Sequence, residues 1–80
     1  MVRAEEVSTI AFGIELKRAR DAIGLSQMQL GVRIGVSGKT VCLWEQGKQQ
    51  PGVRILDSLF NALKADHVQR LVWIKLLGAR

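Results

Sequence analysis

The spacing of apolar residues predicts an all-α chain. In residues 9–23, apolar side chains recur three or four positions apart, as the buried stripe of a helix requires: Phe12, Leu16, Ala19 and Ile23. Gly24 is expected to end this helix, and residues 1–8 before it are expected to be loose. A loop with the turn residues Gly and Pro covers residues 47–52, and the helix expected over residues 53–63 then turns four apolar side chains to the core: Leu56, Leu59, Phe60 and Leu63.

Between these segments lie two shorter helical patterns separated by a tight break. Ser26 can cap the first, and Leu30 and Ile34 then lie four residues apart on one face. Gly35 suits the left-handed position at a helix end, and Ser37 can cap a second helix that runs to about residue 47. Two helices this close together predict a helix-turn-helix, in which one helix can dock into the DNA major groove.

The second of these short helices has two faces of different character. Val41 and Trp44 fall on one side, where they can pack on the preceding helix. The opposite side carries a stripe with i, i+3, i+4 and i+7 spacing: Lys39, Cys42, Leu43 and Gln46. Most such stripes are solvated surface, but the short preceding helix and the basic chain favour a stripe that meets DNA.

A last helix is expected within residues 64–80, where Asp66 can cap it and His67 lies on the surface at its start. Its apolar residues cover more than one stripe, which is more than a domain of 80 residues can hide against itself. We therefore expect part of this helix to form a dimer interface: Leu71, Trp73, Ile74 and Leu77. The alternative is that the whole helix closes the core of its own domain.

Length and charge are those of one small domain with a polyanionic partner. The chain of 80 residues holds 12 Lys and Arg against 7 Asp and Glu, a formal net charge of +5. Charge alone does not separate DNA from RNA or an acidic protein. No apolar run approaches the roughly 20 residues of a membrane span, and no signal-peptide pattern opens the chain. The expected location is cytoplasmic, with the nucleoid.

Cysteine and histidine usage argues against a metal site and against an enzyme. A single Cys42 cannot form an internal disulfide, and the single His67 leaves no ligand set for zinc. Cys42 is interpreted as a small residue that allows close approach to the groove, with a redox switch on DNA binding as the weaker alternative. No catalytic motif and no phosphate-binding glycine loop is present, so no enzymatic activity, cofactor or small-molecule ligand is expected.

Three segments in register resemble the Cro and lambda-repressor-like family of helix-turn-helix domains, the xenobiotic-response-element class. They are FGIELKRARDAIGLSQ, QLGVRIGVSGKTVCLWEQGKQQP and ILDSLFNAL, which lie within residues 12–63. The resemblance implies four helices in the family core, residues 9–63, of which the second and third form the helix-turn-helix. With the last helix added, the chain is expected to be a single five-helix domain of the lambda-repressor-like type. The resemblance also implies that Trp44 wedges the recognition helix against that core, and that Arg20 and Glu45 form a buried ion pair.

The same resemblance implies where DNA is contacted. Base edges would be read from four positions: Gly38, Lys39, Cys42 and Leu43. Phosphate contacts are implied for Gln27, which also resembles a base-edge contact, and for Gln46 and Lys48. We expect further phosphate contacts from Ser37 and Arg54.

Three residues depart from the family pattern. Gly31 stands where alanine is usual, at a cost of about 1 kcal/mol inside a helix, so close helix contact is the expected compensation. Gly38 has no side chain where the family often carries a glutamine that reads adenine. Leu43 is apolar where a polar reader is common, which favours contact with a thymine methyl group or packing against a neighbour.

The expected function is a homodimeric repressor that binds an inverted-repeat operator, with half-sites roughly 34 Å apart. Two alternatives stay open. An antitoxin of the same fold would bind a toxin protein and repress its own operon. A protein-interaction module that has lost DNA binding is the other, because Gly38, Cys42 and Leu43 make the reading face less polar than usual.

Overall fold

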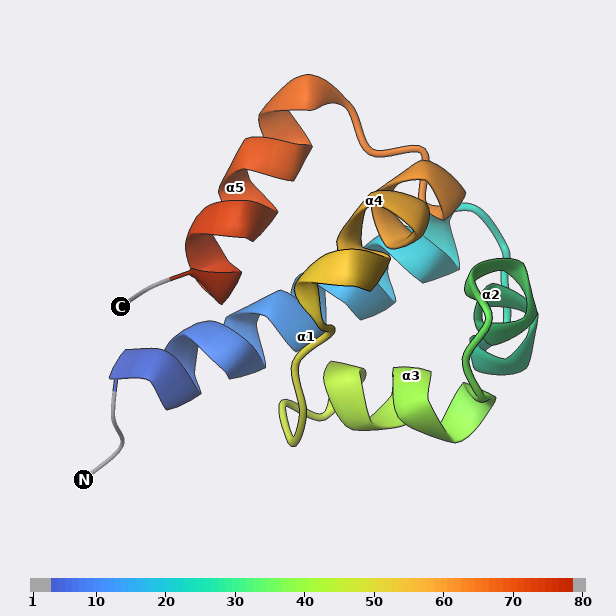
Figure 1. The fold of residues 1–80 in the computed structure, drawn as a ribbon, viewed down its shortest axis with the longest axis horizontal. Coiled ribbons are helices and arrows are strands. Elements are labelled where there is room, and N and C mark those ends of the chain that lie inside the picture. The colour runs from blue at the N-terminus through green and yellow to red at the C-terminus, as the bar shows by residue number, and fades with distance from the viewer. Residues whose placement is uncertain (1–3, 79–80) are drawn as a thin grey trace.

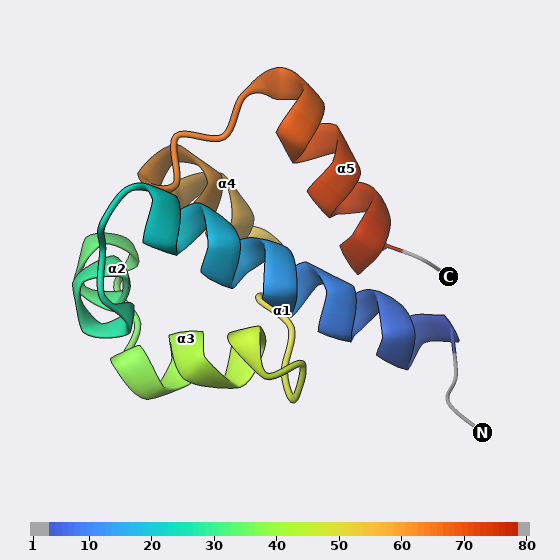
Figure 2. The same ribbon diagram turned by 180° about the vertical axis from the view of Figure 1, so that it is seen from behind.

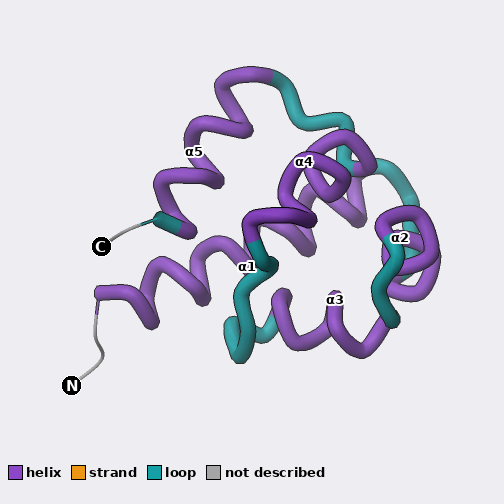
Figure 3. Tube along the Cα trace, in the orientation of Figure 1, coloured by secondary structure: helices purple, strands orange, loops and turns teal. Residues whose placement is uncertain are grey.

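Five α-helices make up the part of the chain that the structure describes, residues 4–78 (Figure 1). The computed structural model has them in this order: α1 (Ala4–Ala22), α2 (Gln27–Ile34), α3 (Gly38–Glu45), α4 (Val53–Ala62) and α5 (His67–Leu77). Helices and connecting loops account for all of this part, and no strand occurs in it (Figure 3). The expected all-α, five-helix architecture is confirmed, with α2 packed on α3 as a helix-turn-helix requires.

The long helix α1 is the support on which the other helices are arranged. α3 and α5 pack on opposite sides of it, whereas α2 packs on α3 and α4 (Figures 1 and 2). Apolar side chains from all five helices, and two from the α4–α5 connection, meet in a single core: Phe12, Leu16, Leu30, Val41, Trp44, Leu59, Phe60, Leu63, Ala65 and Trp73. The two short helices of the helix-turn-helix are therefore held by one core.

The first helix begins earlier than the sequence pattern indicates. α1 starts at Ala4, so residues 4–8 are helical and the expectation of a loose segment there is wrong; residues 1–3 lie outside the described part. Polarity does not prevent a helix in this stretch. Residues 5 and 6 are both glutamate, which is a good helix former.

The ends of the helices carry the capping residues that the sequence predicts. The side chains of Ser26, Ser37 and Asp66 each accept a hydrogen bond from a backbone N–H three residues on, at the starts of α2, α3 and α5. Gly24 follows α1 with a positive φ of 74°. α3 ends at Glu45 and α4 at Ala62, one or two residues before the expected limits.

After α4 the left-handed position is taken by a lysine. Lys64 has φ 56°, and it is the one non-glycine residue with positive φ in the described part of the chain. The Ala65 N–H donates to the Phe60 carbonyl at 3.0 Å and the Lys64 N–H to the Asn61 carbonyl at 3.1 Å. These are the two hydrogen bonds of a Schellman motif, in which glycine is the usual residue because a Cβ is strained there.

Trp73 lies in the core, so its expected place in a dimer interface is wrong. Its side chain is 1% exposed and packs edge-on against Phe12, with ring centroids 6.3 Å apart, and against Phe60 at 5.4 Å. Leu77 is also partly buried against the core. The other two expected interface residues, Leu71 and Ile74, are 54% and 50% exposed. α5 therefore closes the core with one face and leaves an apolar outer face.

An arginine that the sequence pattern does not single out joins α5 to α4. The Arg70 guanidinium donates from Nε to the Ala65 carbonyl at 3.1 Å and from its Nη2 to Asn61 Oδ1, and it lies 5.9 Å from the centre of the Phe60 ring. No helix within residues 4–78 has the length and the apolar character needed to cross a membrane.

Replacing Lys64 by glycine is expected to raise the free energy of unfolding by about 0.5 to 1 kcal/mol. Glycine relieves the strain of a Cβ at positive φ, and part of that gain is offset by the greater entropy of glycine in the unfolded chain. Urea denaturation measures the change. Lys64→Ala is the control, because it removes the lysine side chain and keeps the Cβ; equal stabilisation by alanine would show that the strain is not the cause.

Candidate nucleic-acid interface

The turn between α2 and α3 depends on a close approach of the two helices at Gly31. The Gly31 carbonyl accepts from the N–H groups of Gly35, at 2.8 Å, and Val36, at 2.9 Å, and Gly35 has φ 82°. A Cβ at Gly31 would collide with the Val36 carbonyl oxygen and lie 3.1 Å from the Ser37 carbonyl carbon. The close helix contact expected to compensate for glycine here is confirmed.

Gly38, at the start of α3, lies against the first turn of α2. A Cβ at this position would be 3.1 Å from Met28 Cα and 3.2 Å from Met28 N, tighter than ordinary contact. A larger residue would therefore push the two helices apart by a few tenths of an ångström. Base contact from Gly38 stays a prediction, and it has to be made by the backbone.

The two faces of α3 differ in exposure as the sequence predicts. Val41 is fully buried and Trp44 is 4% exposed, so Trp44 does wedge the helix against the core. On the outer side Lys39 and Gln46 are exposed, while Cys42 and Leu43 are half-buried. Gln46 Nε2 lies 3.4 Å from Cys42 Sγ as a hydrogen-bond donor. Lys39 is thus the exposed cation in the first turn of this helix.

Arg20 and Glu45 form the buried ion pair that the family resemblance implies. Arg20 Nε donates to Glu45 Oε2 at 2.6 Å and Arg20 Nη2 to Glu45 Oε1 at 3.0 Å, with side chains 9% and 4% exposed. Arg20 Nη1 also donates to the Leu25 carbonyl at 2.7 Å and lies 3.3 Å from Asp21 Oδ1. The hydrogen bonds to Glu45, together with its charge, raise the pKa of the Arg20 guanidinium above its ordinary value.

Gln27, the first residue of α2, joins this pair. Its Nε2 donates to Glu45 Oε1 at 3.0 Å, so the side chain expected at a phosphate is held at the end of α3. The two residues are 18 positions apart, and no periodicity in the sequence links them. Ser37, another expected phosphate contact, accepts from the Thr40 N–H at 3.1 Å as the cap of α3.

Gly13 is a further residue that the sequence pattern does not single out. A Cβ there would lie 2.5 Å from the Trp44 carbonyl oxygen and 2.6 Å from that of Glu45, so only glycine lets the end of α3 lie so close to α1. The sequence did carry a signal for this contact, namely a glycine inside a predicted helix. Such a glycine costs about 1 kcal/mol relative to alanine and therefore indicates a compensating contact.

This arrangement agrees with comparisons to known proteins. A family model described as a helix-turn-helix domain matches residues 11–73. The chain belongs to this helix-turn-helix family. An uncharacterized HTH-type transcriptional regulator from Methanothermobacter thermautotrophicus (strain Delta H) is 26% identical over 65 residues, which are 81% of this chain and 94% of the relative. No solved structure matches the chain significantly.

The charges of this helix-turn-helix protein are segregated along the chain. Between Asp21 and Asp57 the sequence holds a single carboxylate, that of Glu45, which Arg20 neutralises. The same stretch holds four cations: Arg33, Lys39, Lys48 and Arg54. All four are exposed, and none of them forms an ion pair within residues 4–78. The segment from α2 to the start of α4 is therefore positive without an exposed acid.

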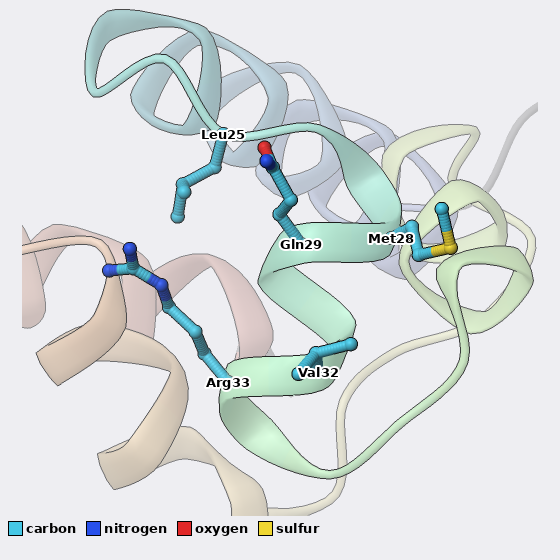
Figure 4. Close-up of a pocket in the computed structure, with 5 residues that line it drawn as sticks. All are labelled: Leu25, Met28, Gln29, Val32 and Arg33. Carbon is cyan, nitrogen blue, oxygen red and sulfur yellow. The ribbon is translucent and has the colours of Figure 1, made fainter.

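An open apolar groove lies along α2. It is lined by Leu25, Met28, Gln29, Val32 and Arg33 (Figure 4). Met28 and Val32 are 69% and 77% exposed and extend to the same side of the helix, opposite to Arg33.

Across residues 4–78, no three His, Cys, Asp or Glu side chains are grouped closely enough to hold a metal ion.

Glu45→Gln is expected to lower the free energy of unfolding, because it leaves the Arg20 charge buried without its main counter-charge. Loss of one partner from a buried pair costs about 3 to 5 kcal/mol, and the nearby Asp21 favours the lower end. Circular dichroism during thermal and urea unfolding gives the value.

The matched control is Glu15→Gln, which removes the carboxylate of the exposed Arg18–Glu15 pair at 3.3 Å. We expect this variant to lose less than about 1 kcal/mol. If Glu45→Gln melted like the wild type, the claim that this pair is a buried, stabilising one would be wrong.

Proposed function

We propose that this protein is a transcriptional repressor that binds an inverted-repeat operator as a homodimer and reads the major groove with α3. The observation that carries the proposal is the segment from α2 to the start of α4, which holds four exposed cations and one neutralised carboxylate. Exposed cations without an exposed acid nearby attract the phosphate backbone. The relative named as a transcriptional regulator supports a role in the regulation of transcription.

Lys39 is the proposed base-reading residue. It is exposed in the first turn of α3, which is the part of a recognition helix that reaches base edges. A lysine there can donate to O6 and N7 of guanine. The half-buried Cys42 and Leu43 follow one turn later, where Leu43 would contact a thymine methyl group.

Phosphates are proposed to be bound at both ends of α3. Gln27 and Ser37 lie at the starts of α2 and α3, and Gln46 and Lys48 follow the last turn of α3. Arg54 lies in the first turn of α4 and is exposed. Contacts made by the cations release counterions, so affinity should fall as salt rises.

The outer face of α5 is the proposed dimer interface. Four apolar side chains there are about half exposed or more: Val68 at 69%, Leu71 at 54%, Val72 at 49% and Ile74 at 50%. A twofold axis through this face would pair the same patch on two copies. In the proposed complex each copy reads one half-site with its α3, and the half-sites lie roughly 34 Å apart in successive major grooves.

The proposal is tested by titrating the purified protein against DNA from immediately upstream of its own gene and against scrambled DNA, across a salt series. Tight binding to one site with twofold symmetry would establish an autoregulatory dimer. Equally weak, salt-sensitive binding to both DNAs would overturn sequence-specific repression and favour a protein as the main partner.

In the same assay Lys39→Ala is expected to change which operator sequences are preferred, with a loss of about 1 to 3 kcal/mol at the base pair it reads. The control is Lys64→Ala, which removes the same charge from the α4–α5 connection. This connection is drawn at the top of Figure 1, whereas α3 is at the bottom, so the control should change affinity by less than about twofold. Equal weakening of Lys39→Ala on every sequence would make Lys39 a phosphate contact.

Leu71→Glu is expected to weaken self-association by tenfold or more, on the order of 1.4 kcal/mol, because it buries a carboxylate in each half of a symmetric interface. Light scattering after size exclusion reports the mass across a dilution series. The control Val32→Glu adds the same charge to an exposed apolar residue of α2 and should leave the mass unchanged. A monomeric wild type, or equal dissociation of both variants, would contradict an interface on α5.

A further inference from the structure

The orientation of the Gln27 side-chain amide is fixed by its hydrogen-bond partner, the Glu45 carboxylate. Glu45 Oε1, 3.0 Å away, belongs to a carboxylate that already accepts from Arg20 and can only accept, so Gln27 must present its amide nitrogen to it. An amide nitrogen carries two hydrogens, and one of them is used here. The second is left for a partner outside the chain, since the half-buried Gln27 side chain makes no other hydrogen bond within residues 4–78.

Glu45 is in turn unable to move away. Its two oxygens accept from Arg20 at 2.6 and 3.0 Å, and its side chain is 4% exposed. The same guanidinium donates to the Leu25 carbonyl at 2.7 Å, two residues before Gln27. Arg20 therefore fixes both the backbone that leads into α2 and the carboxylate that orients the first side chain of α2.

We infer that Glu45 is a positioning residue for DNA binding, which holds the Gln27 amide so that its free N–H, rather than its carbonyl, faces a backbone phosphate. This inference rests on the proposed function, because it takes the start of α2 to face DNA. It gives the buried pair a second role besides stability. Arg20 and Glu45 do not touch the phosphate, and Gln27 does.

The inference and simple charge counting predict opposite signs for one variant. Glu45→Gln removes the single carboxylate between Asp21 and Asp57, so net charge alone predicts tighter binding to any DNA. An amide at position 45 can accept or donate, and Gln27 is then free to turn its carbonyl toward the phosphate. Positioning by Glu45 therefore predicts weaker binding.

The experiment is a double-mutant cycle that compares the affinities of the variants for a mixed-sequence DNA duplex at low temperature. Circular dichroism measures the folded fraction of each variant, and the affinities are corrected for it. Gln27→Ala and Glu45→Gln should each weaken binding by about tenfold, the size of one lost hydrogen bond to a charged group. The combined variant should be no weaker than Gln27→Ala alone, because both changes remove the same contact. Binding by Glu45→Gln as tight as the wild type, or an equal effect of Gln27→Ala in both backgrounds, would overturn the inference.

A second pair of variants decides the question if Glu45→Gln does not fold at the assay temperature. Gln27→Glu places a carboxylate against Glu45 and toward the phosphate, and should bind mixed-sequence DNA at least about tenfold more weakly than Gln29→Glu. Gln29→Glu carries the same charge change two residues away. It keeps the capping box with Ser26, in which glutamate serves as well as glutamine. Equal affinity of the two variants would overturn the inference.

Failure of the inference can be told from failure of the proposed function. Phosphate contacts act on any DNA sequence, so the cycle can be read even if the wild type prefers no operator. If the wild type shows no preference for an operator but residues 27 and 45 are coupled in the cycle, the proposed repressor function is wrong and the positioning role of Glu45 stands. If the wild type prefers an operator but residues 27 and 45 are not coupled, the positioning role is wrong and the proposed function stands.

Discussion

The buried pair of Arg20 and Glu45 is the interaction on which the helix-turn-helix depends. The guanidinium comes from the last turn of α1, and the carboxylate is the last residue of α3. Between them they bind the Leu25 carbonyl, at the entry to α2, and the Gln27 amide, at its first residue. One pair of side chains thus fixes the start of α2 and the end of α3 relative to α1. Because both charges are almost without water, neither can be lost without leaving the other unpaired.

Two helices of eight residues each could not hold this geometry by themselves. Isolated helices of that length are unstable in water, so their order comes from packing. Glycines make the packing close: Gly31 admits the turn and Gly13 admits the end of α3 against α1. Trp44 of α3 and Trp73 of α5 then fill the core from their own helices, which pack on opposite sides of α1 (Figure 1). The cost of glycine inside a helix is offset by contacts that no other residue permits.

The same packing separates the charges that meet solvent from those that do not. The acid of the α2–α4 segment is turned inward to Arg20, whereas Lys39, Lys48 and Arg54 stay exposed. A positive surface for DNA is therefore a consequence of where one carboxylate lies, as much as of the number of cations. α5 shows the same division for apolar residues, with Trp73 inside and Leu71 outside.

The sequence by itself determined the features that depend on neighbours within about one helical turn. The caps at Ser26, Ser37 and Asp66, the left-handed Gly35 and the buried stripe of α3 all follow from local spacing, and the family resemblance supplied the Arg20–Glu45 pair. Only the tertiary structure decided the start of α1 at Ala4, the inward turn of Trp73, the need for glycine at position 13 and the hydrogen bond from Gln27 to Glu45. The last three are contacts between segments far apart in the chain. Such contacts depend on how the helices stack, and helical periodicity leaves that open: a helix with apolar residues on several sides, such as α5, does not show which side will face the core.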